Sequence, residues 1–313
     1  MAAGSASAQL SADAQKAFTN YQHLAPHRAF VLSGDGKTYD WAGASGADPS
    51  GAVANALKRC EEHSKSGCSL YAVNNVVLNG RDWKAAAPPV APAIGRLRPE
   101  FYWDNKGPHA AAGLIVWSHG YLPGHDSTAS APQGEVAWFT EQGYDLYRFD
   151  REWIHDIQAD AADLVAAVRQ AKAMGYRRVI LAGQSNGAWT TLEAIRLGAP
   201  ADGVISVSAA HHGQVKDMRD VSIARADWQK LVRDLKPGPR VFLVIFKDDA
   251  FDVGGRTGDV IDAFAKSGVE SIVEAYPPGF SGHDAANARG FGEKYGACIR
   301  AFIETGARQP PCI

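Results

Sequence analysis

The sequence predicts a two-part protein of the α/β class, in which a mainly parallel sheet flanked by helices follows a small disulfide-stapled α+β unit. From residue 114 onward, apolar runs of four to six residues alternate with amphipathic segments, a pattern typical of parallel strands joined by helices. A proline-rich stretch precedes that region, and a short segment with two cysteines precedes the stretch. We therefore expect an N-terminal unit over 1–83, a linker over 84–99 and a main domain over 100–313.

The composition is that of an ordinary globular protein. Apolar residues make up 46% and charged residues 21% of the 313, which argues against a disordered or fibrous chain. The 32 Lys and Arg are balanced by 34 Asp and Glu, so the chain lacks a basic field that would hold nucleic acid or an anionic membrane. No apolar run approaches the roughly 18 residues that cross a bilayer. We expect neither a nucleic-acid partner nor a membrane span.

The first 83 residues predict a ββαβ arrangement. A hairpin is expected around Gly34-Asp35-Gly36, because short apolar or aromatic runs flank these turn residues. Asp48-Pro49 is typical of a helix start, and apolar residues follow it with helical spacing. The expected strands are 29–33, 38–42 and 69–78, and the expected helix ends near residue 65.

The stretch 84–99 contains four prolines. Proline lacks the backbone N–H that a helix interior or a central strand requires. We therefore expect a linker here, or a strap over a surface.

The main domain shows strands alternating with helices. Asp156 is a suitable N-cap, and Gly143, Gly175 and Gly198 each follow a helical segment, where glycine commonly ends a helix. Most of the strands are short apolar runs, as expected where both faces of a sheet are covered. The expected strands are 114–117, 144–149, 179–182, 204–207, 241–246 and 271–275, and the expected helices are 131–142, 156–175, 187–197, 222–235, 256–266 and a last one ending near 304.

The four cysteines form two pairs that are local in sequence. Cys60 and Cys68 are 8 residues apart, and Cys298 and Cys312 are 14 apart. Four cysteines allow three pairings, of which we favour the local one, 60–68 with 298–312. Four free thiols remain the alternative. A zinc site is not expected, because the chain has no C-x-x-C motif.

The N-terminus favours export. Ala6-Ser7-Ala8 has the A-x-A form that ends a secretory signal peptide, although an apolar h-region is absent before it. The alternative is a plain Ala/Ser tail. Together with the cysteine pairs, this predicts a secreted or periplasmic protein.

The segment Gly183-Gln184-Ser185-Asn186-Gly187 has the form G-x-S-x-G between an expected strand and an expected helix. Such a turn is strained and tight, so glycine stands where a side chain would collide with backbone. The turn lifts the Ser185 hydroxyl above the sheet edge and brings the Asn186 amide beside it. We expect Ser185 to be a nucleophile. The alternative is a structural turn whose serine caps the helix.

A serine hydroxyl needs a base, and the base needs a group that orients it. His283 follows the last strand and is the only histidine beyond His212, so we expect it to be the base. Three aspartates follow the strand 241–246. Asp249 is the expected acid, with Asp252 as the alternative and Asp248 as a third candidate. The order serine, aspartate, histidine is that of α/β-hydrolases.

Residues from about 100 to 305, two thirds of the chain, resemble the α/β-hydrolase family, nearest to its dienelactone hydrolase-like and secreted esterase members. The resemblance rests on the elbow 183–187, on Trp117-Ser-His-Gly-Tyr121 and on Ser281-Gly-His-Asp284. It implies the α/β-hydrolase fold and hydrolysis through an acyl-enzyme, without a metal or other cofactor. Dienelactone hydrolases proper use a cysteine nucleophile, whereas this elbow carries serine.

The same resemblance suggests further site residues. The segment 117–121 resembles the family's oxyanion loop, so the expected donors to the oxyanion are the backbone amides of Tyr121 and Asn186. His119 is expected to be a structural hydrogen-bonding residue, with participation in the site as the alternative. Asp150-Arg151 resembles a structural pair of the family. Weaker candidates for the substrate pocket, each with a structural role as the alternative, are His212, Trp153 and Trp189.

These expectations together point to a serine esterase that acts on a small-molecule or polymeric ester. A serine peptidase or a thioesterase would use the same machinery. A hydrolase scaffold with an idle site, serving as a binding module through residues 1–83, is the alternative from another class. The sequence carries no information on oligomeric state.

Overall fold

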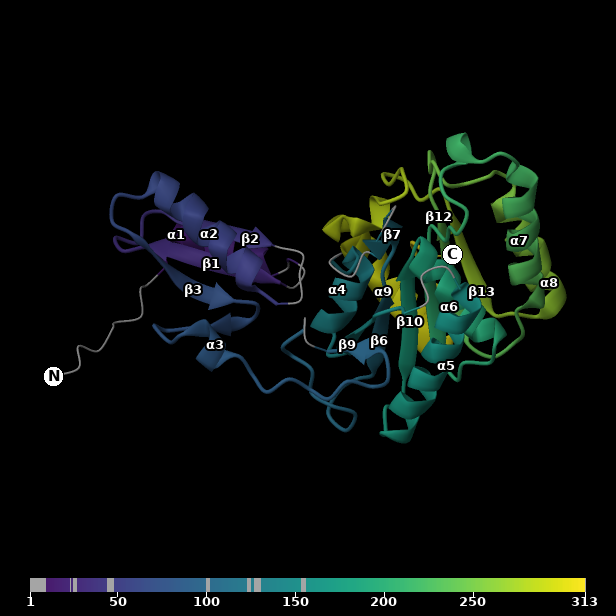
Figure 1. Cartoon of the computed structure of the whole chain (residues 1–313), viewed down its shortest axis with the longest axis horizontal. Coiled ribbons are helices and arrows are strands. Elements are labelled where there is room, and N and C mark those ends of the chain that lie inside the picture. Colours follow the sequence, from purple (N-terminus) through teal and green to yellow (C-terminus); the bar gives the residue numbers. More distant parts are fainter. Residues whose placement is uncertain are drawn as a thin grey trace. The chain divides into compact units, whose positions relative to one another are not determined.

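The computed structural model describes residues 10–22, 24, 27–43, 48–99, 102–122, 125–126, 131–152 and 156–312. The chain divides into two compact units (Figure 1). The first comprises Met1–Ala91, Pro99–Asn105 and Ala129–Ala131, and the second comprises Pro92–Arg98, Lys106–Thr128 and Pro132–Ile313.

The N-terminal unit is built on a four-stranded antiparallel sheet with the strand order β2-β1-β3-β4. Side chains of β1 alternate between the two faces of this sheet. Val31 packs with helix α2 on one face, and Phe30 packs with Phe18 and Tyr21 of helix α1 on the other. The elements are α1 (Ala12–Gln22), β1 (Arg28–Ser33), β2 (Tyr39–Gly43), α2 (Ser50–His63), β3 (Cys68–Val73), β4 (Val76–Val77) and α3 (Trp83–Ala86).

The expected ββαβ order is present, with three differences. Helix α3 follows it and overlaps the start of the stretch expected as a linker, before the first proline of that stretch. Helix α1 precedes it and was not expected. The expected strand 69–78 is two strands, because Asn74 adopts a left-handed φ of 47° and turns the chain between β3 and β4. Asparagine tolerates this conformation better than most residues do.

Both expected cysteine pairs form disulfides and use all four cysteines. Cys60–Cys68 joins the last turn of α2 to the start of β3. Cys298–Cys312 joins helix α9 (Arg289–Thr305) to the C-terminal segment. Each disulfide therefore closes a loop within one unit.

The second unit is built on a seven-stranded sheet with the order β13-β12-β11-β10-β6-β9-β5. All neighbouring strands are parallel except β5, which pairs antiparallel with β9 at one edge. The strands are β5 (Leu97–Arg98), β6 (Leu114–Ser118), β9 (Asp145–Phe149), β10 (Val179–Gln184), β11 (Gly203–Val207), β12 (Arg240–Ile245) and β13 (Ser271–Ala275). A separate two-stranded sheet pairs β7 (Tyr121–Leu122) with β8 (His125–Asp126).

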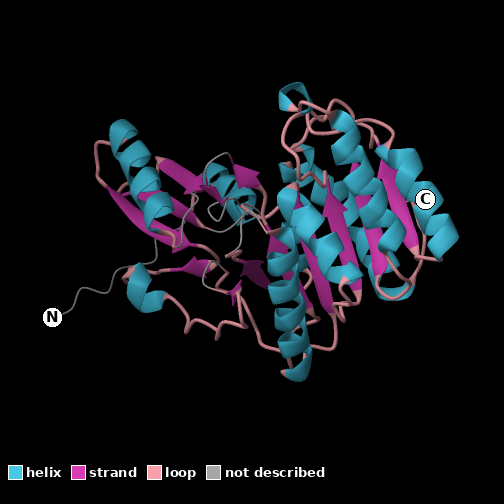
Figure 2. Ribbon diagram, turned by 45° about the vertical axis from the view of Figure 1, so that its right-hand side comes forward, coloured by secondary structure: helices cyan, strands magenta, loops and turns pink. Residues whose placement is uncertain are grey.

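Helices lie on either side of the seven-stranded sheet (Figure 2). They are α4 (Gly134–Glu141), α5 (Ile157–Ala173), α6 (Asn186–Arg196), α7 (Val221–Asp234), α8 (Arg256–Ser267) and α9, with short turns η1 (Val215–Asp217) and η2 (Ala285–Asn287). Helix α4 packs against α9, α5 against α6, and α7 against α8. Strands β6, β10 and β11 are buried along their whole length, which explains their mainly apolar sequences.

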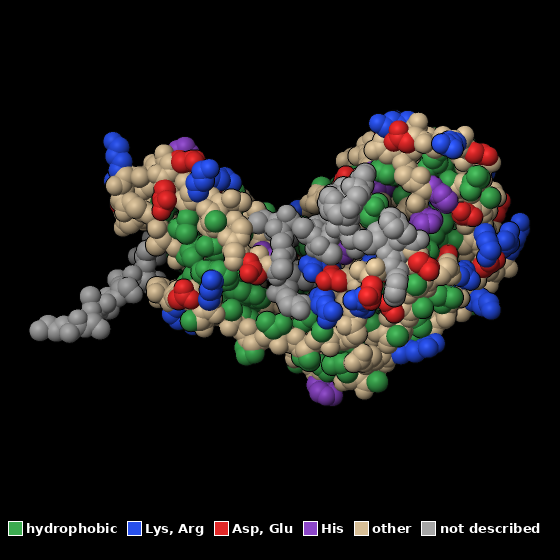
Figure 3. Space-filling model, viewed as in Figure 1, with side chains coloured by type: hydrophobic (Ala, Val, Ile, Leu, Met, Phe, Trp, Pro, Cys, Tyr) green, Lys and Arg blue, Asp and Glu red, His purple; other side chains and the backbone are tan. Residues whose placement is uncertain are grey.

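Basic and acidic side chains are interspersed over the visible face of the described residues (Figure 3). This mixture agrees with the nearly balanced charge of the sequence. None of the described helices is long and apolar enough to span a membrane.

One carboxyl group lies wholly inside the second unit. Glu135, in the first turn of α4, is 0% exposed, and neither of its carboxyl oxygens has a hydrogen-bond partner among the described residues. Burial disfavours the charged form and raises the pKa of Glu135 to about 8. The folded chain therefore holds this carboxyl protonated at neutral pH.

Reducing the two disulfides should lower the Tm by several degrees, because closing a loop of about 15 residues contributes about 3 kcal/mol in the chain-entropy model. Thermal unfolding followed by circular dichroism, with and without dithiothreitol, measures the effect. Thiol titration of the denatured, unreduced protein from an oxidising host should find none of the four cysteines free. Finding all four free would contradict both disulfides.

In the wild type, the free energy of unfolding should fall as the pH rises from about 5 to about 8, and Glu135→Gln should reduce this fall. The unfolded carboxyl ionises near 4.5 and the folded one only near 8, so rising pH favours the unfolded chain within that window. Below the window both states are protonated, and above it the penalty is constant. Unfolding free energies at pH 5 and pH 8 measure the slope, with the exposed Glu141→Gln as the control. An unchanged slope in Glu135→Gln would contradict this role.

Candidate active site

Ser185 stands at the turn from β10 to α6, with a strained backbone at φ 55° and ψ −121°. Its N–H donates to the Val207 carbonyl at 3.0 Å, and its own carbonyl accepts from Trp189 and Ala210, each at 3.1 Å. The Ser185 side chain makes no capping hydrogen bond to the described part of helix α6. The strained conformation is thus held by backbone bonds along the chain and across to β11, and the hydroxyl is not used as a cap.

Gly183 and Gly187 are required by close backbone approach, whereas Gly120 is approached by a side chain. A Cβ on Gly187 would overlap the Ser118 carbonyl oxygen, and one on Gly183 would lie 2.5 Å from the Gly187 carbonyl oxygen. A Cβ on Gly120 would lie 2.6 Å from Gln184 Oε1. This agrees with the steric argument made from the G-x-S-x-G pattern.

The parallel register of β6 and β10 sets Ser118 opposite Gly183. The chain that follows β6 therefore leaves the sheet beside the elbow. A Cβ on Gly120 would lie only 3.5 Å from the Cβ of Ser185. The loop 119–121 and the elbow thus meet at the carboxyl edge of the sheet, where ligands bind in open α/β sheets.

His283 and Asp249 come from the loops after β13 and β12 and form a hydrogen bond. Nδ1 of His283 lies 2.8 Å from Oδ1 of Asp249. The side chains are 12% and 2% exposed, so the pair is shielded from water. Oδ1 of Asp249 also accepts the Phe251 N–H at 2.8 Å, and the Phe251 ring centroid lies 4.0 Å from that of His283. Nε2 of His283 is buried and has no hydrogen-bond partner among the described residues.

The two other candidate acids are engaged elsewhere. Asp248 Oδ2 accepts from the Ser281 hydroxyl at 2.9 Å. Asp252 Oδ1 accepts from the Gly254 N–H at 3.0 Å, within its own loop. Of the three aspartates, Asp249 is the one whose carboxylate contacts the imidazole of His283.

Hydrogen bonds join the loop of His283 to its neighbours. The Gly282 N–H donates to the Lys247 carbonyl at 2.8 Å, which links this loop to the one that carries Asp249. Gln184 Nε2 donates to Asp284 Oδ1 at 3.3 Å, which links it to the elbow. The elbow, the acid loop and the histidine loop are therefore one connected network.

A buried arginine joins the elbow to the loop 119–121. Arg151 is 7% exposed, and its Nη1 donates to Asn186 Oδ1 at 2.7 Å while Nη2 donates to the Gly120 carbonyl at 2.7 Å. Arg151 Nη2 also lies 3.1 Å from Nδ1 of His119, which is 0% exposed. His119 thus lies inside this network.

A second buried arginine lies near the acid loop. Arg256 is 4% exposed, donates to the Ala209 carbonyl and has its guanidinium carbon 4.1 Å from the Trp228 ring centroid. Burial lowers its pKa, while the Asp252 and Asp249 carboxylates raise it. Sequence reasoning missed Arg256. The available signal was a cation at the first residue of a helix, where the helix dipole disfavours it.

The weaker candidates for the substrate pocket lie in different surroundings. Trp189 is 4% exposed and packs against Trp228 with ring centroids 5.9 Å apart, which is the core role stated as its alternative. His212 Nε2 lies 3.0 Å from Asp227 Oδ2. Its neighbour His211 is the more exposed of the two. Trp153 lies outside the described residues.

Among the described residues, no group of three or more His, Cys, Asp or Glu side chains is arranged to hold a metal ion. The oxyanion donors expected from sequence, Tyr121 and Asn186, are the first residues of β7 and α6. Arg151 bonds to Gly120, directly before Tyr121, and to the side chain of Asn186.

No family model and no curated protein matches this chain. Solved structures do resemble it. A truncated carbohydrate esterase from gut microbiota is similar with a TM-score of 0.51 and 11% identity, over 69% of this chain and 96% of that one. An esterase of Pyrococcus furiosus has a TM-score of 0.47 and 13% identity, over 62% and 82% of the two chains. Est1E from Butyrivibrio proteoclasticus has a TM-score of 0.46 and 16% identity, over 64% and 93%.

The identities are low, so the likeness bears on fold alone. The strand order, the single antiparallel edge strand and the strained serine turn after β10 agree with the resemblance in the sequence. The second unit of this chain has the α/β-hydrolase fold.

Proposed function

We propose that the chain is a serine hydrolase that cleaves carboxylic esters through an acyl-enzyme, with Ser185, His283 and Asp249 as its triad. The observation that carries the proposal is the shielded 2.8 Å hydrogen bond between His283 Nδ1 and Asp249 Oδ1. It leaves Nε2 without a partner among the described residues. The histidine loop contacts Gln184 of the elbow, whose serine is not used as a cap. An imidazole held in this way is suited to take a proton at Nε2.

In the proposed reaction, the Ser185 hydroxyl attacks the ester carbonyl carbon while Nε2 of His283 takes its proton. Asp249 holds Nδ1–H and stabilises the imidazolium that forms. The tetrahedral intermediate collapses, the ester C–O bond breaks, and the alcohol leaves with the proton from His283. Water then attacks the acyl-enzyme by the same steps, and the acid leaves.

The proposed oxyanion donors are the amides of Tyr121 and Asn186. The Gly120 carbonyl and the Tyr121 N–H belong to one planar trans peptide and point in opposite directions. Arg151 binds that carbonyl, so it fixes the direction of the Tyr121 N–H and turns it away from the guanidinium. Arg151 also holds the side chain of Asn186, the other proposed donor residue. We infer that Arg151 is a positioning residue for the oxyanion site.

The preference for esters over peptides or thioesters rests on the family resemblance, since all three need the same machinery. The substrate is a small or polymeric ester. We further propose that residues 1–83, 84–99 and 100–313 act as an N-terminal unit, a linker and a catalytic domain. The two disulfides support a secreted or periplasmic setting. Rates on matched p-nitrophenyl ester, anilide and thioester substrates decide between the three chemistries.

Ser185→Ala and His283→Ala should each lower kcat on p-nitrophenyl acetate by about 10⁴ or more. The double variant should lose little further, because the two residues act as a unit. Asp249→Asn should cost about 10⁴ through the wrong histidine tautomer. Asp252→Asn is the matched control and should be mild. If Asp252→Asn lost most of its kcat while Asp249→Asn kept most of it, the triad acid would be Asp252. If the kcat losses of Ser185→Ala and His283→Ala were additive in the double variant, His283 would not be the base.

Arg151→Met should lower kcat by about 10²–10³ with little change in KM, because it frees the peptide that carries a donor made for the transition state. Arg148→Met is the control on the same segment, since Arg148 pairs with Asp150 at 2.5 Å. The Tm of each variant is measured beside the kinetics. A loss confined to Tm, or an equal loss in both variants, would assign Arg151 a structural role only.

A further inference from the structure

The segment after β12 binds the Asp249 carboxylate through its own backbone. Oδ1 of Asp249 accepts the Phe251 N–H at 2.8 Å, which is a turn typical of aspartate, and the Asp252 N–H donates to the Asp249 carbonyl at 3.1 Å. The peptide between Ala250 and Phe251 is also held at its carbonyl end, because the Ala250 carbonyl accepts the Val215 N–H at 2.9 Å. These three hydrogen bonds fix the backbone that carries the Phe251 side chain.

The phenyl ring of Phe251 lies against the imidazole of His283. The ring centroids are 4.0 Å apart and the ring planes differ by 31°, so the imidazole contacts the face of the phenyl ring and not its edge. Asp249 bonds to the imidazole at Nδ1, on the edge of that ring. The carboxylate and the phenyl face therefore constrain the imidazole from two different directions.

The face of an aromatic ring carries partial negative charge and attracts a cation. The neutral imidazole of the resting enzyme gains little from this attraction. The imidazolium that forms when His283 takes the Ser185 proton gains more, because it carries a full positive charge. A contact that is stronger in the transition state than in the ground state raises kcat and leaves KM nearly unchanged.

We propose that Phe251 is a positioning residue of the triad, whose ring face stabilises the imidazolium form of His283 and keeps the imidazole plane in place. This role rests on the proposed function, because it needs His283 as the base. A side chain that only fills space would act through its size and not through the charge of a ring face. The bond from the Phe251 N–H to Asp249 belongs to the backbone, so side-chain variants at this position change the ring alone.

Steady-state hydrolysis of p-nitrophenyl acetate by the full chain tests this role. Phe251→Leu keeps an apolar side chain without a π face and should lower kcat about 3- to 30-fold, with little change in KM, as expected for a lost cation–π contact. Phe251→Tyr retains the ring face and should keep most of the kcat. Phe280→Leu is the matched control and should equal the wild type, because Phe280 precedes His283 on the same loop but packs on Phe291 and Tyr295.

Phe251→pentafluorophenylalanine separates the charge of the ring face from packing. Fluorination reverses the quadrupole of the ring with little change in its shape, so this variant should lose at least as much kcat as Phe251→Leu. Circular dichroism checks that each variant is folded. A kcat equal to that of the wild type in the fluorinated variant, or equal losses in Phe251→Leu and Phe280→Leu, would overturn the proposal.

Labelling of Ser185 by a fluorophosphonate separates this proposal from the proposed ester hydrolysis. In the labelling reaction the Ser185 oxygen bonds to phosphorus, fluoride leaves and His283 takes the proton, so the labelling rates should follow the same order as kcat. Labelling in that order by a chain that cleaves no ester would refute ester hydrolysis and leave the role of Phe251 standing. Ester hydrolysis that is unchanged in the Phe251 variants would do the reverse. A wild type that neither cleaves esters nor reacts with the fluorophosphonate would refute both.

Discussion

The backbone of Ser185 has a positive φ, which few residues other than glycine adopt. Backbone hydrogen bonds to neighbouring segments of the second unit hold it in this conformation. Positive φ at a non-glycine residue costs on the order of 1–3 kcal/mol. The carbonyl of Ser185 accepts two backbone N–H groups, and its N–H reaches β11, so three hydrogen bonds oppose relaxation. Relaxing the turn would also disturb the register by which β6 places Ser118 opposite Gly183.

Two buried arginines, Arg151 and Arg256, bind near this turn, and each joins segments that are far apart in sequence. Arg151 connects the segment after β9 to the loop after β6 and to α6. Arg256 connects the start of α8 to the Ala209 carbonyl and lies where the Asp249 and Asp252 carboxylates favour its charged form. A buried cation without such partners would carry a desolvation penalty of several kcal/mol, so each of these arginines ties its segment to the others.

The sequence predicted most strands of the large sheet, because strands such as β10 and β11 are covered on both faces and consist mainly of apolar residues. It missed β5, β7 and β8, because two-residue strands carry no periodicity. It missed α1, whose polar residues outnumber its buried ones. Among the three candidate acids, the sequence favoured Asp249 only through its distance from the end of the strand 241–246. The contacts of Arg256 and the burial of Trp189 depend on partners more than 25 positions away, which local patterns do not encode.

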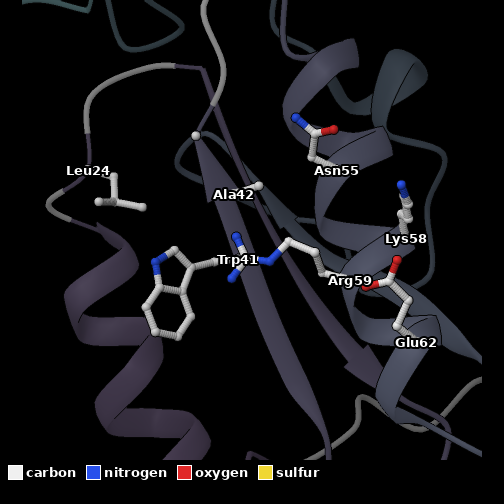
Figure 4. A pocket seen from close by; sticks show the side chains of 8 residues that line it. Leu24, Trp41, Ala42, Asn55, Lys58, Arg59 and Glu62 are labelled. Atoms are coloured by element: carbon white, nitrogen blue, oxygen red, sulfur yellow. The ribbon is translucent and has the colours of Figure 1, made fainter.

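The contact between Gly187 and the Ser118 carbonyl limits how this elbow can evolve. Any side chain at residue 187 meets the backbone of a central strand, and a backbone atom cannot move aside as a side chain can. A substitution at 187 must therefore displace the end of β6, on which the elbow itself is seated. Exposed positions such as Asn55 on α2 carry no such constraint, because their side chains extend into solvent (Figure 4).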